Sequence, residues 1–173
     1  MKITTIGLDI AKRFFHVVCC NEQGRLVKKK MLKRAQVLSF FQQHTTCLVA
    51  LEACATSHFW AREIRKCGHQ IKLIPPQHVK AFLVGNKNDY NDALAISVAS
   101  KQHHIKSVCI KSVGQQDNQA QHKARELAVR QRTALCNQIR GLTAEYGIIL
   151  NRGVNTIRKS IPLILEDENT GLS

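Results

Sequence analysis

Four acidic residues occupy positions where carboxylates are unusual. Asp9 and Glu52 each lie inside an apolar run, and Asp89 and Asp92 open a helix-like segment at 88–96. A carboxylate in an apolar strand loses hydration and needs a compensating partner. One shared divalent cation would compensate several of these charges, and Mg²⁺ or Mn²⁺ prefers such hard oxygen ligands. The pattern indicates metal-dependent phosphoryl-transfer chemistry.

Each of these acids also has an ordinary interpretation. Asp9 could cap the turn before Lys12, and Glu52 could pair with a lysine. Asp89 is a suitable helix N-cap, and Asp92 would be favoured in a first helical turn by the helix dipole. The metal hypothesis explains all four together. Two strand acids and two helix acids three residues apart would form a cup for two cations about 3.5–4 Å apart.

The histidines and cysteines do not suggest a metal site. The eight histidines are scattered, and we assign none of them to a metal. The seven cysteines form no CxxC motif, and Cys67 and His69 have no second ligand pair at a zinc-like spacing. We expect the cysteines to be mostly small buried hydrophobic residues of a reducing cytosol.

The charge balance indicates a polyanionic partner. The 173 residues contain 26 Lys and Arg against 12 Asp and Glu, a formal net charge of +14. Nucleic acid is the first candidate partner and an anionic membrane the second. No apolar run approaches membrane-spanning length, and residues 1–5 do not resemble a signal peptide. The basic residues that we expect to contact nucleic acid are Lys28, Lys29, Lys30, Lys33, Arg34, Arg125, Arg132 and Arg140.

The order of predicted elements indicates an α/β fold. Antiparallel strands come first and alternating helices and strands follow, which is typical of a mixed sheet with helices on its faces. The predicted loop 85–88 precedes the helix that carries Asp89. We expect strands at 3–10, 14–20, 25–32, 47–53, 70–74 and 107–111, and helices at 35–44, 57–67, 77–84 and 89–101.

A long helix is predicted from about 115 to 146, where Gly141 is the one glycine and proline is absent. It either packs on the sheet domain or on its own copy, or it forms a dimerising, nucleic-acid-contacting coiled coil. We therefore expect domains at 1–112 and 113–150 and a weakly patterned tail at 151–173. The apolar stripe of the long helix consists of Leu135, Ile139, Leu142, Tyr146 and Ile149.

An ordered set of motifs resembles a known family. The motifs are Ile6–Lys12, Leu51–Ala53, Gly68–Ile71 with Ile74–Pro76, Lys87–Ala93, Gln131–Leu142 and Ala144–Ile148. In this order they resemble the N-terminal DEDD domain of insertion-sequence transposases recognised as bridge-RNA-guided recombinases, and the resemblance covers roughly residues 3–150.

This resemblance implies a RuvC-like, ribonuclease H-like fold followed by a coiled-coil helix. It implies that Asp9, Glu52, Asp89 and Asp92 bind Mg²⁺ (or Mn²⁺) and cleave and exchange DNA strands. The implied partners are DNA, a structured guide RNA and a second copy of the chain through the long helix. The implied location is a prokaryotic cytoplasm, at the nucleoid.

Members of the family continue into a C-terminal domain that carries a nucleophilic serine. This sequence ends at Ser173 without that domain. We therefore expect the chain by itself to bind nucleic acid without completing recombination.

Three other functions fit part of the sequence. Sugar kinases and actin-like ATPases also open with Gly-x-Asp, but they need a glycine- and Ser/Thr-rich turn where this chain has Ala11–Phe14. A RuvC-type junction nuclease would use the same four acids. A catalytically inactive remnant would bind DNA or RNA through its basic surface alone.

Overall fold

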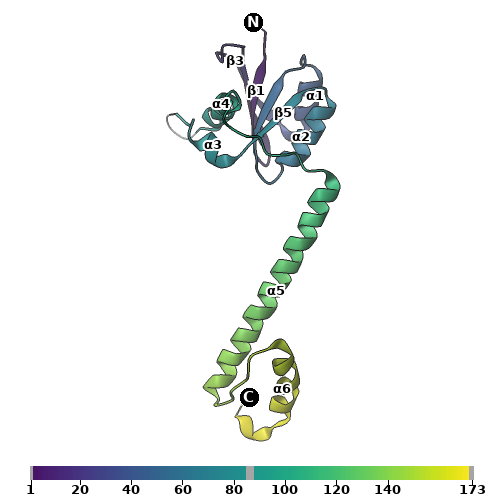
Figure 1. Ribbon diagram of the computed structural model, residues 1–173, viewed down its shortest axis with the longest axis vertical. Helices are drawn as coiled ribbons and strands as arrows, with labels where there is room; N and C mark the ends of the chain where they lie inside the picture. Colours follow the sequence, from purple (N-terminus) through teal and green to yellow (C-terminus); the bar gives the residue numbers. More distant parts are fainter. Residues whose placement is uncertain (1, 85–87, 172–173) are drawn as a thin grey trace. The chain divides into compact units, whose positions relative to one another are not determined.

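A mixed sheet of five strands organises the N-terminal part of the computed structural model, which describes residues 2–84 and 88–171 (Figure 1). Strands β2 and β3 extend β1 by antiparallel pairing, whereas β4 and β5 join its other side in parallel. The strand order β3-β2-β1-β4-β5 is that of a ribonuclease H-like sheet, which confirms the predicted fold class. The strands are β1 (Thr5–Ile10), β2 (Phe14–Cys20), β3 (Leu26–Lys33), β4 (Leu48–Glu52) and β5 (Gln70–Ile74).

The turn between β2 and β3 forms where the sequence predicts it. Gly24 adopts a positive φ of 81°, a conformation that glycine tolerates at little cost. The side chain of Asn21 closes the turn, because its Oδ1 accepts a hydrogen bond of 2.8 Å from the backbone N–H of Arg25. This turn fixes the register in which β3 pairs with β2.

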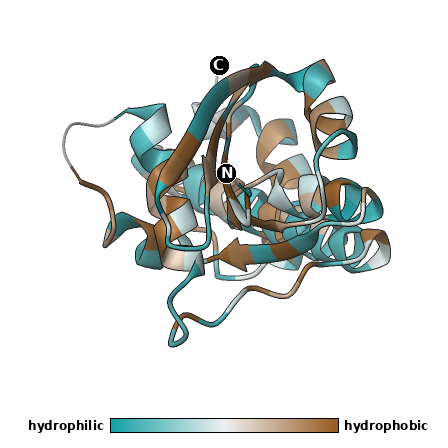
Figure 2. Cartoon of the chain, turned by 90° about the horizontal axis from the view of Figure 1, so that it is seen from above, coloured by the Kyte–Doolittle hydropathy of each residue, from teal (hydrophilic) through white to brown (hydrophobic). Residues whose placement is uncertain are grey.

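Helices cover both faces of the sheet (Figure 1). The 3₁₀ turn η1 (Arg34–Gln36), α1 (Val37–Gln42) and α2 (Ser57–Lys66) lie on one face. The helices α3 (Pro76–Lys80) and α4 (Asp89–Ser100) lie on the other. The helices carry both hydrophobic and hydrophilic residues, as expected for helices that cover a sheet with one side (Figure 2).

The larger core lies between the sheet and helices α1 and α2. Phe15 and Phe41 are fully buried there, and Trp60 packs edge-on against Phe15 with ring centroids 4.9 Å apart. His69 is also buried in this region, where Nε2 lies 2.9 Å from the carbonyl oxygen of Phe41 and Nδ1 accepts from the backbone N–H of Cys47. These contacts give His69 a structural role rather than a metal-binding one.

Helix α4 approaches the sheet unusually closely at Gly7. A Cβ atom on Gly7 would lie 2.0 Å from the carbonyl oxygen of Ala93 and 3.0 Å from the Cβ of Ser97. The C-terminal end of the helix is held by Lys72 Nζ, which donates a hydrogen bond of 2.7 Å to the carbonyl oxygen of Ser100. Small residues on the contact face of α4 therefore let the helix lie close to the sheet, and Lys72 of β5 holds its C-terminal end.

Several predicted boundaries need correction. No strand forms at 107–111, where Val108 makes a single isolated bridge to Leu73. The helix expected over 35–44 begins as a 3₁₀ turn, and α3 ends at Lys80 rather than at 84. In the predicted loop 85–88, residues 85–87 lie outside the described residues. Of the cysteines, Cys19, Cys20 and Cys47 are buried as expected, but Cys54 and Cys109 are exposed.

The residues from 113 onward form a second compact unit. Helix α5 (Val113–Glu145) ends where Gly147 takes a positive φ of 76°, so Tyr146 and Ile149 of the predicted stripe lie beyond the helix. The tail described as weakly patterned contains α6 (Val154–Glu166) and the turn η2 (Glu168–Thr170). Within the described residues, no helix combines the length and the apolar character that crossing a bilayer requires.

We predict that Gly7→Ala lowers the free energy of unfolding by about 1–3 kcal/mol, because the added methyl group collides with the backbone of α4. Chemical denaturation of the parent and the variant measures this loss. Gly141→Ala is the matched control, since beyond the adjacent residues and the helix's own backbone no atom lies within 4 Å of a Cβ built there, and it should leave stability unchanged or raise it by up to about 1 kcal/mol. Equal stability of the Gly7→Ala variant and the parent would contradict the close packing of α4.

Candidate metal centre

Asp9 and Glu52 lie on neighbouring strands at the same end of the sheet. The parallel register pairs Gly7 with Ala50 and Leu8 with Leu51. The next step of this register places Asp9 beside Glu52, and side chains two residues apart on a strand share one face. Both acids therefore extend from the face that α4 covers. Each is half-buried at the point where its strand ends.

Asp89 and Asp92 occupy the first turn of α4. Asn88 is the N-cap, and its side chain accepts a hydrogen bond of 2.9 Å from the backbone N–H of Tyr90. The alternative role of Asp89 as the helix cap is therefore wrong. Because α4 packs on β1 at Gly7, its first turn is brought to the end of β1 that carries Asp9.

The charges of the four acids influence one another. The pKa of Asp9 is raised from 3.8 to about 6, first by burial and then by the nearby charges of Asp92 and Asp89; Glu52 adds a smaller effect. Burial and the charge of Asp92 also raise the pKa of Glu52, which Lys80 opposes. Concentrating carboxylates in this way is unfavourable unless a cation is bound.

A histidine that we did not assign to the site lies among these acids. One nitrogen of His16 and one carboxylate oxygen each of Asp9 and Asp89 lie within 4.8 Å of one another. His16 is the antiparallel partner of Asp9 in the β1–β2 register, so both side chains extend from one face. Strand alternation puts His16 on the same face of β2 as Phe14 and Val18, but only the register with β1 shows that this is the acid-bearing face.

The donor set suits a divalent cation. Carboxylate oxygens are the ligands that Mg²⁺ and Mn²⁺ prefer, and the mutual repulsion of these acids is what bound positive charge would relieve. Asp9 and Asp89 are the acids in the cluster within 4.8 Å. Asp92 and Glu52 act on Asp9 through their charges, and among the neighbouring acids Asp92 has the largest effect and Glu52 the smallest.

The expected basic residues of β3 are divided between the two faces of the sheet. Lys29 lies over the ring of Tyr90 on the α4 face, with Nζ 5.6 Å from the ring centroid. The strand alternation places Lys33 on this face as well. On the opposite face, Lys30 lies over Phe40 and the Arg34 guanidinium over Trp60, and Lys28 pairs in register with Cys19. Lys80 is a further basic residue near Glu52, and it is not among the basic residues that we expected from the sequence.

The three arginines of the long helix lie in the second unit. Arg125 and Arg132 are exposed on α5, and Arg140 is half-buried and donates a hydrogen bond to Asn137. In the apolar stripe, Leu135 and Leu142 are more than half exposed. These observations describe a helix with solvent-exposed apolar and basic residues.

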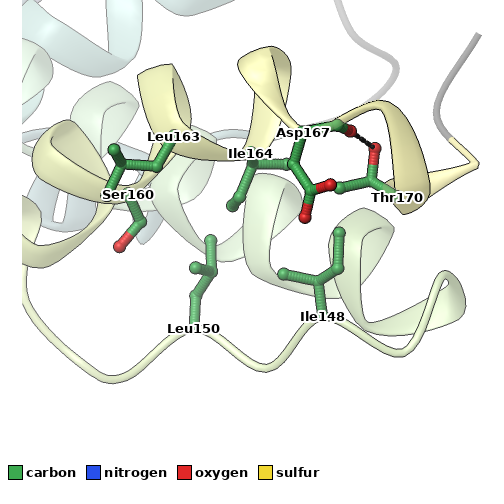
Figure 3. Close-up of a pocket in the computed structure, with 7 residues that line it drawn as sticks. All are labelled: Ile148, Leu150, Ser160, Leu163, Ile164, Asp167 and Thr170. Carbon is green, nitrogen blue, oxygen red and sulfur yellow. Dashed lines mark hydrogen bonds between the residues drawn. The ribbon is translucent and has the colours of Figure 1, made fainter.

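A pocket in the second unit has a different character (Figure 3). Ile148 and Leu150 face Leu163 and Ile164 across it, and Asp167 is the one acidic residue among the seven that are drawn. The Thr170 hydroxyl donates a hydrogen bond of 3.0 Å to the backbone carbonyl of Asp167. A single carboxylate among aliphatic side chains does not provide a donor set comparable to that around Asp9.

Comparison with known proteins shows the family to which the chain belongs. The model of the transposase family DEDD_Tnp_IS110 matches residues 6–148, which include all four acids. The chain belongs to this family of IS110-type transposases. It is 47% identical over 152 residues to a Pseudomonas aeruginosa protein named "Probable family 20 transposase", covering 88% of this chain and 45% of that one. It is 41% identical over 171 residues to the transposase for insertion sequence element IS1111A of Coxiella burnetii, covering 99% of this chain and 47% of that one.

The IS110-type chain thus spans about half the length of the curated relatives that it matches. Among solved structures, it is similar to Thermus thermophilus RuvC with a TM-score of 0.47 and 14% identity, over 60% of this chain and 99% of that one.

We predict that the metal-free IS110-type domain loses stability as pH rises from about 4 to about 6. In this window the folded protein retains a proton on Asp9 that the unfolded chain releases near pH 3.8, so deprotonation favours unfolding. Asp9→Asn removes this effect and should be more stable than the parent at pH 7 without metal. Thermal melts in EDTA across this pH range measure the difference between the two proteins.

Asp117→Asn is the matched control, because Asp117 is an exposed acid of α5 in the second unit. Its melting temperature should follow that of the parent at every pH. A constant difference between Asp9→Asn and the parent from pH 4 to pH 7 would show that Asp9 does not titrate as described.

Proposed function

We propose that this chain supplies the divalent-metal-dependent DNA-cleaving centre of an IS110-type transposase. The observation that supports this most directly is the convergence of carboxylates from β1, β4 and α4 at one end of the sheet. An excess of positive charge elsewhere, with a formal net charge of +14, suits a nucleic-acid substrate.

The four acids divide into two pairs in this proposal. Asp9 and Asp89 hold Mg²⁺ (or Mn²⁺) directly, and Glu52 and Asp92 complete the negative cup that attracts cations. The cation, when bound, polarises the scissile phosphate and lowers the pKa of an attacking water or hydroxyl. Because Asp9 and Glu52 end adjacent strands of a rigid sheet, the two carboxylates stay in place while DNA binds.

The basic residues on the acid-bearing face would position the phosphate backbone. Lys29 and Lys33 of β3 lie on one side of the acids, and Lys80 lies near Glu52. Lysines bind phosphates without reading sequence, so they would set the position of a strand and leave target choice to another component. A structured guide RNA, paired with the target, is the component that we propose for that choice.

Assembly is the second part of the proposal. The exposed Leu135 and Leu142 on α5 would be covered by α5 of a second copy, while Arg125, Arg132 and Arg140 contact DNA or RNA. Burial of each large apolar side chain contributes roughly 1.5–3 kcal/mol. The proposed place of action is the cytoplasm, at the nucleoid.

We predict that Mn²⁺ or Mg²⁺ raises the melting temperature of the parent and supports cleavage of branched DNA. Asp9→Asn and Asp89→Asn should lose most of the metal-induced shift and the cleavage, because each removes a carboxylate from the cluster within 4.8 Å. Differential scanning fluorimetry and a gel assay with labelled DNA measure the two effects.

Glu63→Gln provides the control, since Glu63 forms an ion pair with Lys66 on α2 and should not affect either measurement. If Asp9→Asn keeps the full metal-induced shift, the cation binds elsewhere. Metal binding without cleavage by the parent would instead favour the inactive nucleic-acid-binding function.

We also predict that Lys29→Ala weakens cleavage and DNA binding more than Lys28→Ala does. The two variants remove the same charge from adjacent exposed positions, but Lys29 lies on the face of the acids and Lys28 on the opposite face. Fluorescence anisotropy at several salt concentrations should give a smaller salt slope for Lys29→Ala, by about one phosphate contact. Identical slopes and rates for the two variants would refute a role for this face.

A further inference from the structure

His16 is a buried imidazole that faces the acid centre from the middle of β2. The residue is 8% exposed, and it pairs in register with Asp9 on the neighbouring strand. Its Nδ1 makes no hydrogen bond within the described residues. The nearest charged atom is Oδ2 of Asp89, 3.5 Å away.

An unpaired buried nitrogen calls for an explanation, because most buried polar atoms have a hydrogen-bond partner. An ion pair with Asp89 explains this nitrogen only in part. It requires a protonated imidazole, the atoms are too far apart for a good hydrogen bond, and the Asp89 side chain is 62% exposed. A ligand located between the imidazole and the carboxylates would satisfy the nitrogen and relieve the acids together.

We propose that His16 is a nitrogen ligand of the metal centre, with Nδ1 binding the same divalent cation as one oxygen each of Asp9 and Asp89. This inference rests on the proposed function and deepens it. Three atoms that lie within 4.8 Å of one another can reach one cation with small side-chain movements, because metal–nitrogen and metal–oxygen bonds are about 2.0–2.2 Å long. Binding through Nδ1 places the remaining imidazole proton on Nε2.

The neighbours of His16 restrict how its ring can move. Tyr90, in the first turn of α4, packs edge-on against the imidazole with ring centroids 4.9 Å apart. Lys29 covers Tyr90 in turn. These ring contacts limit the rotation of the imidazole.

A mixed nitrogen and oxygen donor set changes which cation the site prefers. Imidazole favours transition metals, whereas Mg²⁺ prefers an all-oxygen environment. We therefore expect the parent to bind Mn²⁺ more tightly than Mg²⁺. Loss of an outer-shell partner weakens metal binding by roughly 10–100-fold, so loss of a direct ligand in His16→Gln should weaken Mn²⁺ binding by at least as much. The same variant should weaken Mg²⁺ binding by a smaller factor.

The decisive measurement is electron spin-echo envelope modulation of the Mn²⁺-loaded parent, which detects a directly bound imidazole nitrogen. The expected spectrum contains ¹⁴N modulation that disappears in His16→Gln and persists in His103→Gln, since His103 is exposed and follows the end of α4 opposite to Asp89 and Asp92. The parent spectrum needs no variant, so the test does not depend on how well His16→Gln folds.

The possible results separate the two proposals. If Mn²⁺ binds to the parent with no ¹⁴N modulation, or if the modulation survives in His16→Gln, His16 is not a ligand, while the carboxylate centre stands. If isothermal titration shows no binding of Mn²⁺ or Mg²⁺ to the parent, both proposals fail.

Discussion

The contact between helix α4 and strand β1 at Gly7 is the constraint on which the candidate site depends. Only a hydrogen atom fits at this position, because a Cβ atom would lie 2.0 Å from the backbone of α4. The helix can therefore lie directly on the strand. Its first turn, with Asp89 and Asp92, then meets Asp9, which is two residues beyond Gly7 on the same face. A larger residue would move the helix and separate the acids.

The close grouping of carboxylates lowers the stability of the metal-free fold through burial and mutual repulsion. Asp9 is affected both by burial and by the charges of its neighbours, which together raise its pKa to about 6. The rest of the domain provides the compensating stability. Phe15, Phe41 and Trp60 pack in the core on the opposite face of the sheet, away from the acids. Packing on both faces of the sheet thus contributes stability, and the α4 face also holds an unfavourable arrangement of charge of the kind typical of functional sites.

The pleat of β3 determines which lysines act together. In the sequence, Lys28, Lys29 and Lys30 form one basic run, but side chains on a strand alternate between faces. Lys29 contacts Tyr90 beside the acids, whereas Lys30 covers Phe40 on the other side. The run is therefore two separate basic surfaces. We propose that the surface around Lys29 serves DNA at the acid centre.

The sequence alone predicted a mixed α/β sheet, five of its six expected strands correctly and the long helix, because apolar runs, a glycine turn and helical periodicity are local patterns. It also singled out the four candidate acids, since Asp9 and Glu52 inside apolar runs and Asp89 and Asp92 at a helix start are visible without coordinates. The tertiary structure decided what depends on pairing between distant segments. Residues 107–111 pair with β5 at one position only, Val108 with Leu73, and therefore form no strand. The structure also corrected local details, since Asn88 rather than Asp89 caps α4 and α6 forms in the weakly patterned tail. His16 joined Asp9 only through the β1–β2 register, which residue spacing does not specify.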